Sequence, residues 1–456
     1  MPVDDDRPDD ATAPTRAAPQ APNVSRFSRF AKLTGLGASV TARHMVQRVA
    51  SAFTDQASAA LGEKRARTKS AEQMTKTLGE MKGAAMKLGQ MLATDPDLVP
   101  PEFVDQLSLL QHSAPAMDFA AVKAVVERAF ERPIEELYAE FSEEPIGAAS
   151  IGQVHKARTK DGMAVAVKVQ YPGIADTIRS DMNNLGSLLV MARAAFPKDR
   201  VDGYLEEITT VIERESDYLN EADNLERFQV VLKDVPGVRV PIPVHELTRK
   251  TVLTMELFHG RRLEDWLTSA PDEQKTVLGQ RLLRAYLEMI HEHGALHADP
   301  HPGNFMVLDD AGIDEVPPIG ILDLGCVRDY PIAFMDLQLK LLVGMWRHDL
   351  DSMQALWREM GFLDSHVDRE LIYDWMMMLF EPLLVDRVTD FGTWKVHEQA
   401  MRFVLENPSI KLWAPPREVL FYVRVLAGIR ALLHKVGMKV NAYQVSRQVV
   451  RERGLI

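Results

Sequence analysis

Three side chains with oxygen ligands follow one another in the second half of the chain, at a spacing suited to magnesium and phosphate chemistry. Asp299 and Asn304 are five residues apart in a loop-forming run, and Asp323 follows an apolar stretch and precedes a glycine. Mg²⁺ keeps several of its waters, so a few such ligands together with phosphate oxygens suffice to bind it. We therefore predict that Asn304 and Asp323 hold Mg²⁺ on ATP and that Asp299 orients the attacking group.

The same residues fit two sequence patterns of protein kinases. Residues 297–304 match the catalytic loop H-x-D-x-x-x-x-N, and Asp323-Leu324-Gly325 matches the metal-binding D-x-G. Each pattern alone is weak evidence, because histidines near aspartates are common and an apolar strand often ends in a turn. Their order along the chain, and the elements that precede them, favour a nucleotide site.

A strand that ends in Lys168 precedes these loops. Residues 165–168 match V-A-I-K, whose lysine contacts the nucleotide phosphates, although an edge strand with a solvated lysine would look the same. Residues 147–154 read as G-x-G-x-x-G-x-V with Ala149 at the second glycine, which predicts a stiffer phosphate loop. The residues expected around the nucleotide are Gly147, Ala148, Ala149, Ser150, Ile151, Gly152, Val154, Ala166 and Lys168.

An acidic helix is predicted over residues 211–233, where leucines and a phenylalanine recur among charged residues. At about 100° per residue, Asp217 and Glu221 would share one face of this helix. Like charges at that spacing predict that cations from elsewhere in the chain neutralise them. We expect Glu221 to be the partner of Lys168 and to act with Lys168 and Asp299 in catalysis; the alternative is a solvated acidic face.

At this point the sequence resembles the UbiB/AarF-type atypical kinases, a family that includes mitochondrial proteins required for coenzyme Q biosynthesis. The match covers about residues 80–330. Besides the motifs above, it rests on Lys87-Leu88-Gly89-Gln90, the KxGQ motif of the family, and on Glu215-Ser216-Asp217, its ExD motif. Ordinary kinases lack the KxGQ element and the alanine-rich loop, so the resemblance is specific.

The resemblance implies a bilobal, protein-kinase-like α+β fold with a helical N-terminal extension and a helical C-lobe. We expect a disordered tail over residues 1–23, the extension over 24–115, the N-lobe over 116–257 and the C-lobe over 258–456. The resemblance also implies a plug in which Lys87 and Gln90 lie over the active site near Glu215 and Asp217. The implied activity is that of an ATP- and Mg²⁺-dependent kinase or ATPase linked to quinone and lipid metabolism.

Several departures from ordinary kinases bear on the reaction. Ala298 replaces the arginine of the catalytic loop, His301 stands where many kinases carry lysine, and no A-P-E motif follows Gly325. Control by activation-loop phosphorylation is therefore not expected, and a conventional Ser/Thr kinase is the least favoured reading. The alternative to an enzyme is a non-catalytic module that binds nucleotide and switches its affinity for lipids or partner proteins.

Composition narrows the class of protein. The chain has 456 residues and a net charge of −12, which argues against a nucleic-acid partner. Its single cysteine, Cys326, excludes an intrachain disulfide and is consistent with the cytoplasm. The sequence gives no indication of the oligomeric state.

A basic stretch near the N-terminus suggests contact with membranes. No acidic residue occurs over residues 11–54, while arginines, a lysine and aromatic residues alternate within 24–50. Such a segment can lie on an anionic membrane surface, where quinone-like lipids would be within reach, or it can pack on its own domain. The longest apolar run, residues 419–433, is interrupted by arginines, so a transmembrane helix is not expected.

Overall fold

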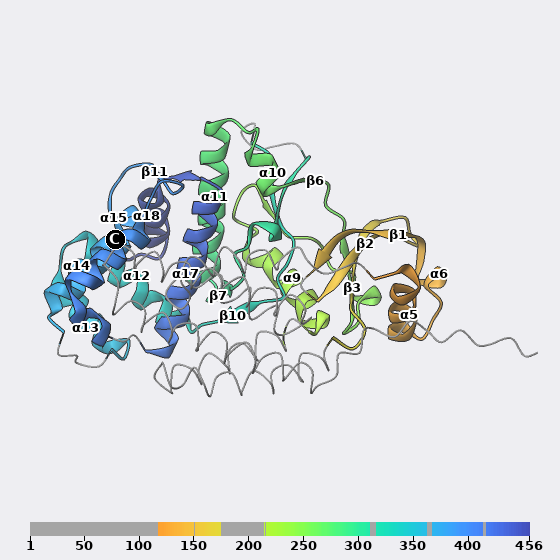
Figure 1. The fold of residues 1–456 in the computed structure, drawn as a ribbon, viewed down its shortest axis with the longest axis horizontal. Helices are drawn as coiled ribbons and strands as arrows, with labels where there is room; N and C mark the ends of the chain where they lie inside the picture. Colours follow the sequence, from red (N-terminus) through yellow and green to blue (C-terminus); the bar gives the residue numbers. More distant parts are fainter. Residues whose placement is uncertain are drawn as a thin grey trace, which may run out of the picture.

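The computed structural model describes residues 117–149, 151–174, 214, 216–310, 316–362, 367–413 and 416–456. These residues form a region built on a four-stranded sheet and a larger, mostly helical region. Figure 1 shows the sheet and α5 on the right, the helices α11 to α18 on the left, and α9, β7 and β10 between them. The arrangement is α+β, as the sequence predicts.

The first sheet has the strand order β1-β2-β3-β5 and is antiparallel throughout. Its strands are β1 (Tyr138–Ala149), β2 (Gly152–Thr159), β3 (Ala164–Gln170) and β5 (Val252–Glu256). Alternate residues of a strand point to opposite faces of a sheet. Both faces of β3 are buried, and this explains why its sequence is a nearly continuous apolar run interrupted by one lysine.

The two faces of this sheet meet different partners. Val165, Val167 and Val169 pack in a small core with the helices α5 (Phe119–Phe130) and α6 (Ile134–Leu137). Ala166 belongs instead to the large core that extends through α9 into the helical region. Lys168 lies two residues after Ala166 and therefore points to that inner side.

The helix predicted over residues 211–233 is interrupted: residue 214 is helical, Ser216 and Asp217 are not, and helix α9 (Tyr218–Val231) follows them. Asp217 has an extended backbone, and its side chain accepts a hydrogen bond from the Leu219 N–H as an N-cap. The predicted shared helical face of Asp217 and Glu221 is therefore wrong, because Asp217 precedes the helix. Its carboxylate is half-buried and lies 3.7 Å from the Lys250 ammonium. Residues 211–213 and 215 lie outside the described part of the chain.

The chain passes from the first sheet to a second one between Glu256 and Gly260. The second sheet has the order β4-β9-β8-β6, formed by β4 (Val238–Arg239), β9 (Ile319–Ile321), β8 (Phe305–Leu308) and β6 (Gly260–Arg262). A Cβ at Gly260 would lie 2.2 Å from the Val307 carbonyl oxygen, so only glycine permits this close pairing. β4 precedes β5 in sequence, yet it belongs to this second sheet, where it pairs in parallel with β9.

The larger region is a stack of helices with short paired strands. Its helices are α10 (Leu263–Leu267), α11 (Asp272–His291), α12 (Ile332–Trp346), α13 (Leu350–Glu359), α14 (Arg369–Leu379), α15 (Glu381–Leu384), α16 (Val396–Glu406), α17 (Arg417–Lys435) and α18 (Ala442–Glu452). Its remaining strands are β7 (Ala295–His297), β10 (Val327–Asp329), β11 (Thr389–Asp390) and β12 (Lys439–Val440). The 3₁₀ turns are η2 (His245–Leu247), η3 (Pro302–Asn304) and η4 (Pro408–Leu412).

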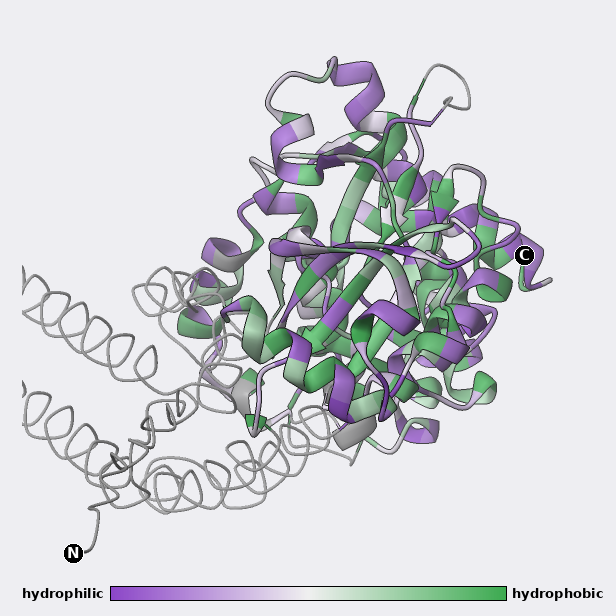
Figure 2. Ribbon diagram, turned by 90° about the vertical axis from the view of Figure 1, so that its right-hand side faces the viewer, coloured by the Kyte–Doolittle hydropathy of each residue, from purple (hydrophilic) through white to green (hydrophobic). Residues whose placement is uncertain are grey.

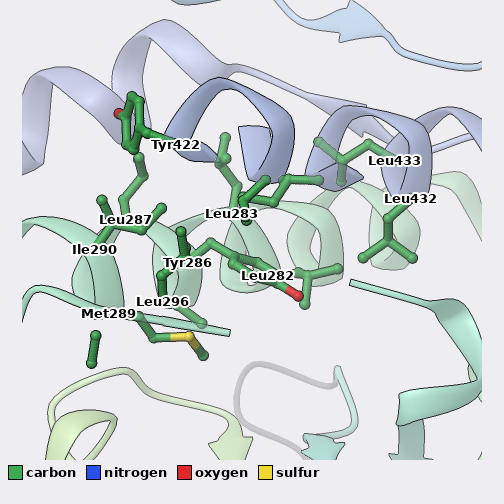
Figure 3. Close-up of a cluster of buried hydrophobic side chains, with 14 of the residues drawn as sticks. Leu282, Leu283, Tyr286, Leu287, Met289, Ile290, Leu296, Tyr422, Leu432 and Leu433 are labelled. Carbon is green, nitrogen blue, oxygen red and sulfur yellow. The ribbon is translucent and has the colours of Figure 1, made fainter. Parts of the chain in front are cut away.

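Helix α11 is the centre of the hydrophobic core. Leu282, Leu283 and Ile290 of this helix are at most 7% exposed, and Figure 3 shows them in one cluster with Tyr422 and Leu433 of α17. Figure 2 shows hydrophobic stretches concentrated in the middle of the described domain and hydrophilic ones toward its outer turns. None of the helices in the part of the chain that the structure describes is both long enough and apolar enough to cross a membrane.

A buried histidine closes the C-terminal end of α11. His291 is 2% exposed and lies edge-on to the ring of Tyr422. Burial lowers the pKa of His291 to about 4; its hydrogen bond to the Met335 backbone and the charge of Asp336 act in the opposite direction, and Arg453 adds to the lowering. His291 is therefore neutral in the folded protein near pH 7.

We expect this histidine to make stability depend on pH. The pKa of His291 is lower in the folded than in the unfolded chain, so the unfolded chain binds more protons and stability falls as pH drops from about 6.5 toward 4. The decrease in the free energy of unfolding over this pH range is about 3 kcal/mol at most. Urea unfolding at pH 7 and at pH 5 measures the free energy of unfolding, and its decrease between the two pH values should be smaller in His291→Phe than in the wild type. The exposed His293 provides the control His293→Phe, and equal decreases in all three proteins would contradict the assignment.

Candidate functional site

A buried lysine joins three elements of the fold. The Nζ of Lys168, on β3, lies 2.9 and 3.0 Å from the two carboxylate oxygens of Glu221, on α9. It also lies 2.8 Å from Oδ2 of Asp323, which follows β9. The expected contact between Lys168 and Glu221 is thus present, and Asp323 joins it from the helical region.

Lys168 is the counter-charge for two carboxylates at this point, those of Glu221 and Asp323. Lys168 is 6% exposed and Glu221 is 2% exposed, so each would be costly to bury without a partner. Burial by itself would lower the pKa of Lys168, but the carboxylates of Asp323 and Glu221 outweigh it and hold that pKa well above its usual value. Lys168 is therefore charged near pH 7.

Two further residues shape the surroundings of Lys168, and sequence patterns did not single them out. The Lys168 ammonium lies 5.2 Å from the ring centroid of Tyr218, the first residue of α9. The side chain of Gln170 donates to the carbonyl oxygens of Ser216 at 2.9 Å and Lys250 at 3.3 Å. Gln170 is two residues after Lys168 on β3, so the strand that presents the lysine also anchors the start of α9.

The predicted catalytic loop lies beside the D-x-G segment because β7 and β10 pair. His297 is opposite Val327 in this antiparallel pair, and the Ala298 N–H donates to the Cys326 carbonyl at 2.9 Å. His297 is fully buried, and its Nδ1 lies 3.1 Å from the Tyr286 hydroxyl. His297 therefore anchors the loop in the core rather than facing a substrate.

The side chains predicted to bind metal are held in defined orientations. Asn304 donates from Nδ2 to the backbone oxygen of Asp299 at 3.0 Å and, more weakly, to its carboxylate at 3.4 Å. The amide nitrogen is engaged in this way, so the carbonyl oxygen is the end of Asn304 that can serve as a ligand. Asp323 accepts the Gly325 N–H on Oδ1 at 2.9 Å. A backbone hydrogen bond brings the two segments together: the Leu322 N–H donates to the backbone carbonyl oxygen of Asn304 at 2.8 Å, next to Asp323.

The donor set suits Mg²⁺ that arrives with a nucleotide. Asp323 provides a carboxylate and Asn304 a neutral amide oxygen, which is a typical protein contribution to a nucleotide-bound Mg²⁺. Among the residues that the structure describes, no three His, Cys, Asp or Glu side chains gather into a cluster that could hold a metal by themselves.

The predicted nucleotide loop forms the tight end of the β1–β2 hairpin. Gly147, Ala148 and Ala149 end β1, and Gly152 begins β2. A Cβ at Gly152 would lie 2.3 Å from the Val169 carbonyl oxygen, so this glycine is required for the close approach of β2 to β3. A space for phosphate is therefore not the only reason for a glycine there.

Of the other residues predicted to contact the nucleotide, two lie beside Lys168 and one does not. Val154 lies directly opposite Lys168 in the β2–β3 register, and Ala166 shares the inner face of β3 with Lys168. The side chain of Ile151 is instead buried in the core, at 4% exposure. Ser150 lies outside the described residues.

The predicted plug lies largely outside the described part of the chain. This applies to Lys87, Gln90 and Glu215. Asp217 is described, and its carboxylate pairs with Lys250. The assignment of these four residues to a plug stays a prediction.

Comparisons with known proteins identify the family of this chain. Residues 109–357 match the model of the ABC1 atypical kinase-like domain. The chain is 31% identical over 376 residues to "Atypical kinase coq-8, mitochondrial" of Caenorhabditis elegans, an alignment that covers 81% of this chain and 49% of that protein. It is 29% identical to "Atypical kinase COQ8, mitochondrial" of Saccharomyces cerevisiae, covering 83% of this chain and 75% of the yeast protein. The chain thus spans about half the length of the nematode relative.

A solved structure has the same fold. The complex of Rv3197 with erythromycin from Mycobacterium tuberculosis aligns with a TM-score of 0.61 and 27% sequence identity. The alignment covers 87% of this chain and 98% of the solved chain. Together with the family match, it confirms the predicted kinase-like α+β fold.

Proposed function

The chain belongs to the family of ABC1 atypical kinase-like proteins, and from this premise we propose that it is a Mg²⁺-dependent, ATP-binding kinase or ATPase. The observation that carries the proposal is the contact of one buried ammonium, Lys168, with both Glu221 and Asp323. Catalysis of phosphoryl transfer consists mainly of positioning and charge stabilisation. A lysine on β3 that contacts Asp323, in the turn Asp323-Leu324-Gly325 (the proposed metal turn), supplies both.

Each residue of the site has a proposed role. Lys168 binds the phosphates and is oriented by Glu221, while Asp323 and Asn304 hold Mg²⁺, which neutralises phosphate charge when bound. Asp299 orients the attacking hydroxyl or water. The nucleotide is surrounded by residues of the β1–β2 hairpin and by Ala166; the hairpin residues are Gly147, Ala148, Ala149, Ser150, Gly152 and Val154. Lys87, Gln90, Glu215 and Asp217 restrict access to the site as the proposed plug.

The biological context is proposed from the relatives. Similarity to the proteins named COQ8, and to the UbiB/AarF-type family, supports a role in the biosynthesis of ubiquinone or another isoprenoid quinone or lipid. The basic residues 24–50 would hold the protein on an anionic membrane surface, where such lipids reside. That segment lies outside the described residues, so its role rests on its sequence.

Phosphate release from Mg-ATP tests the proposed reaction. Purified full-length protein should release phosphate from ATP, faster with anionic liposomes that contain quinone precursors. Asp299→Asn should lower the rate by about 100-fold or more, because it removes the carboxylate that orients the nucleophile. The surface variant Asp309→Asn is the control and should keep the wild-type rate. Tight binding of Mg-ATP without phosphate release under any of these conditions would contradict an enzyme and favour a nucleotide-switched binding module.

A further inference from the structure

Helix α9 contacts the proposed metal turn directly, through a residue that no motif includes. The Asn224 side chain donates from Nδ2 to the Leu324 carbonyl oxygen, with 2.9 Å between the two atoms. Asn224 lies three residues after Glu221, so the two side chains project from the same side of α9. The helix is therefore linked to the turn at two points. Glu221 reaches Asp323 by way of Lys168, and Asn224 binds Leu324 directly.

The carbonyl that Asn224 binds belongs to the peptide group that orients Asp323. The N–H of that same peptide, on Gly325, donates to Asp323 Oδ1 at 2.9 Å. A trans peptide is planar, and its C=O and N–H point in opposite directions. A hydrogen bond that fixes the Leu324 carbonyl therefore also fixes the direction of the Gly325 N–H, and with it the position of the Asp323 carboxylate.

The local sequence leaves this peptide free to rotate unless another residue holds it. Gly325 has no Cβ, so rotation of the Leu324–Gly325 peptide meets little steric resistance. Leu324 is fully buried, and a carbonyl left without a hydrogen bond in such surroundings is costly. The amide of Asn224 supplies this hydrogen bond in one orientation of the peptide only.

We propose that Asn224 is a positioning residue that holds the Asp323 carboxylate in its Mg²⁺-binding orientation through the Leu324–Gly325 peptide. The inference rests on the proposed function, because it concerns the metal role of Asp323. Asn224 touches neither metal nor nucleotide in this scheme. Asparagine is also a poorer helix former than alanine, so its place inside α9 serves the contact with the turn rather than the helix.

The test is the Mg²⁺ concentration needed for ATP to stabilise the full-length protein. The rise in melting temperature with ATP is measured across a Mg²⁺ titration for the wild type, Asn224→Ala and Asn224→Asp. Alanine removes the side-chain amide and favours the helix, while aspartate keeps the size but cannot donate. Both variants should need about tenfold more Mg²⁺ or more, because changes behind a metal ligand cost about 10–100-fold in metal affinity. In EDTA, where we expect ATP to raise the melting temperature less, both variants should show the same rise as the wild type.

A matched control lies one turn further along α9. Arg227 donates to Asp329 at 2.6 Å in a surface ion pair, so Arg227→Gln perturbs the same helix without touching the peptide. This control should show the wild-type Mg²⁺ requirement. Asn224 variants that respond at the wild-type Mg²⁺ concentration would overturn the positioning role and leave the proposed function intact. A wild-type protein without any Mg²⁺-dependent response to ATP would overturn the proposed function and this inference together.

Discussion

Lys168→Met is expected to destabilise the protein by about 3–5 kcal/mol, because it leaves a buried carboxylate without its counter-charge. Glu221 is 2% exposed, and both of its oxygens lie within 3.0 Å of the Lys168 ammonium. Without the lysine, the carboxylates of Glu221 and Asp323 would also repel each other across the space it filled. Methionine has nearly the length of lysine, so the loss reflects charge rather than volume. Urea unfolding at pH 7 measures the change.

Two companion variants isolate the cause of this loss. Lys250→Met removes an exposed ammonium 3.7 Å from Asp217, and a surface pair of this kind contributes about 0–1 kcal/mol. Lys168→Met combined with Glu221→Leu removes both buried charges and should regain part of the lost stability. If Lys168→Met proved as mild as Lys250→Met, the ion pair would not hold the two regions together as we infer.

Asp323→Asn is expected to remove most of the Mg²⁺ dependence of ATP binding. A neutral amide cannot offset the charge of the metal, and its NH₂ group would face either the cation or the Lys168 ammonium. We expect the affinity for Mg-ATP to fall by about 100-fold or more, since even outer-shell changes cost about 10–100-fold. Calorimetric titration with ATP in the presence of Mg²⁺ measures the loss.

The control for Asp323→Asn is Asp329→Asn, six residues later in the chain. Asp329 is exposed and pairs with Arg227 at the surface, so its amide variant changes the net charge equally without touching the site. It should bind Mg-ATP as the wild type does. Unchanged Mg²⁺ dependence in Asp323→Asn would remove this carboxylate from the metal site.

The sequence predicted the fold and the pairing of Lys168 with Glu221 because these depend on motifs with fixed spacing. A lysine within an apolar strand, an acidic helix and an apolar strand before Asp323 each leave a local signature, although β3 continues past Lys168 to Gln170. The start of α9 was not predictable from periodicity. Asp217 fits the helical repeat as well as it fits an N-cap, and only the extended backbone of Asp217 distinguishes the two.

The residues that sequence reasoning missed act through contacts between distant parts of the chain. Asn224 and Leu324 are separated by 100 residues, and Gln170 reaches a carbonyl 46 residues away. Neither contact alters the pattern of apolar residues, which is what sequence reasoning reads. An asparagine inside a helix, one turn after Glu221, was the only local signal available for Asn224.

The most direct test of the central claim is calorimetric titration of the full-length wild-type protein with ATP, in Mg²⁺ and again in EDTA. We predict saturable binding with one ATP per chain in Mg²⁺ and affinity reduced by about tenfold or more in EDTA, because Asp323 and Asn304 bind the phosphates through the metal. Binding of equal strength with and without Mg²⁺, or no binding in either condition, would contradict a Mg-ATP site built on Lys168, Asn304 and Asp323.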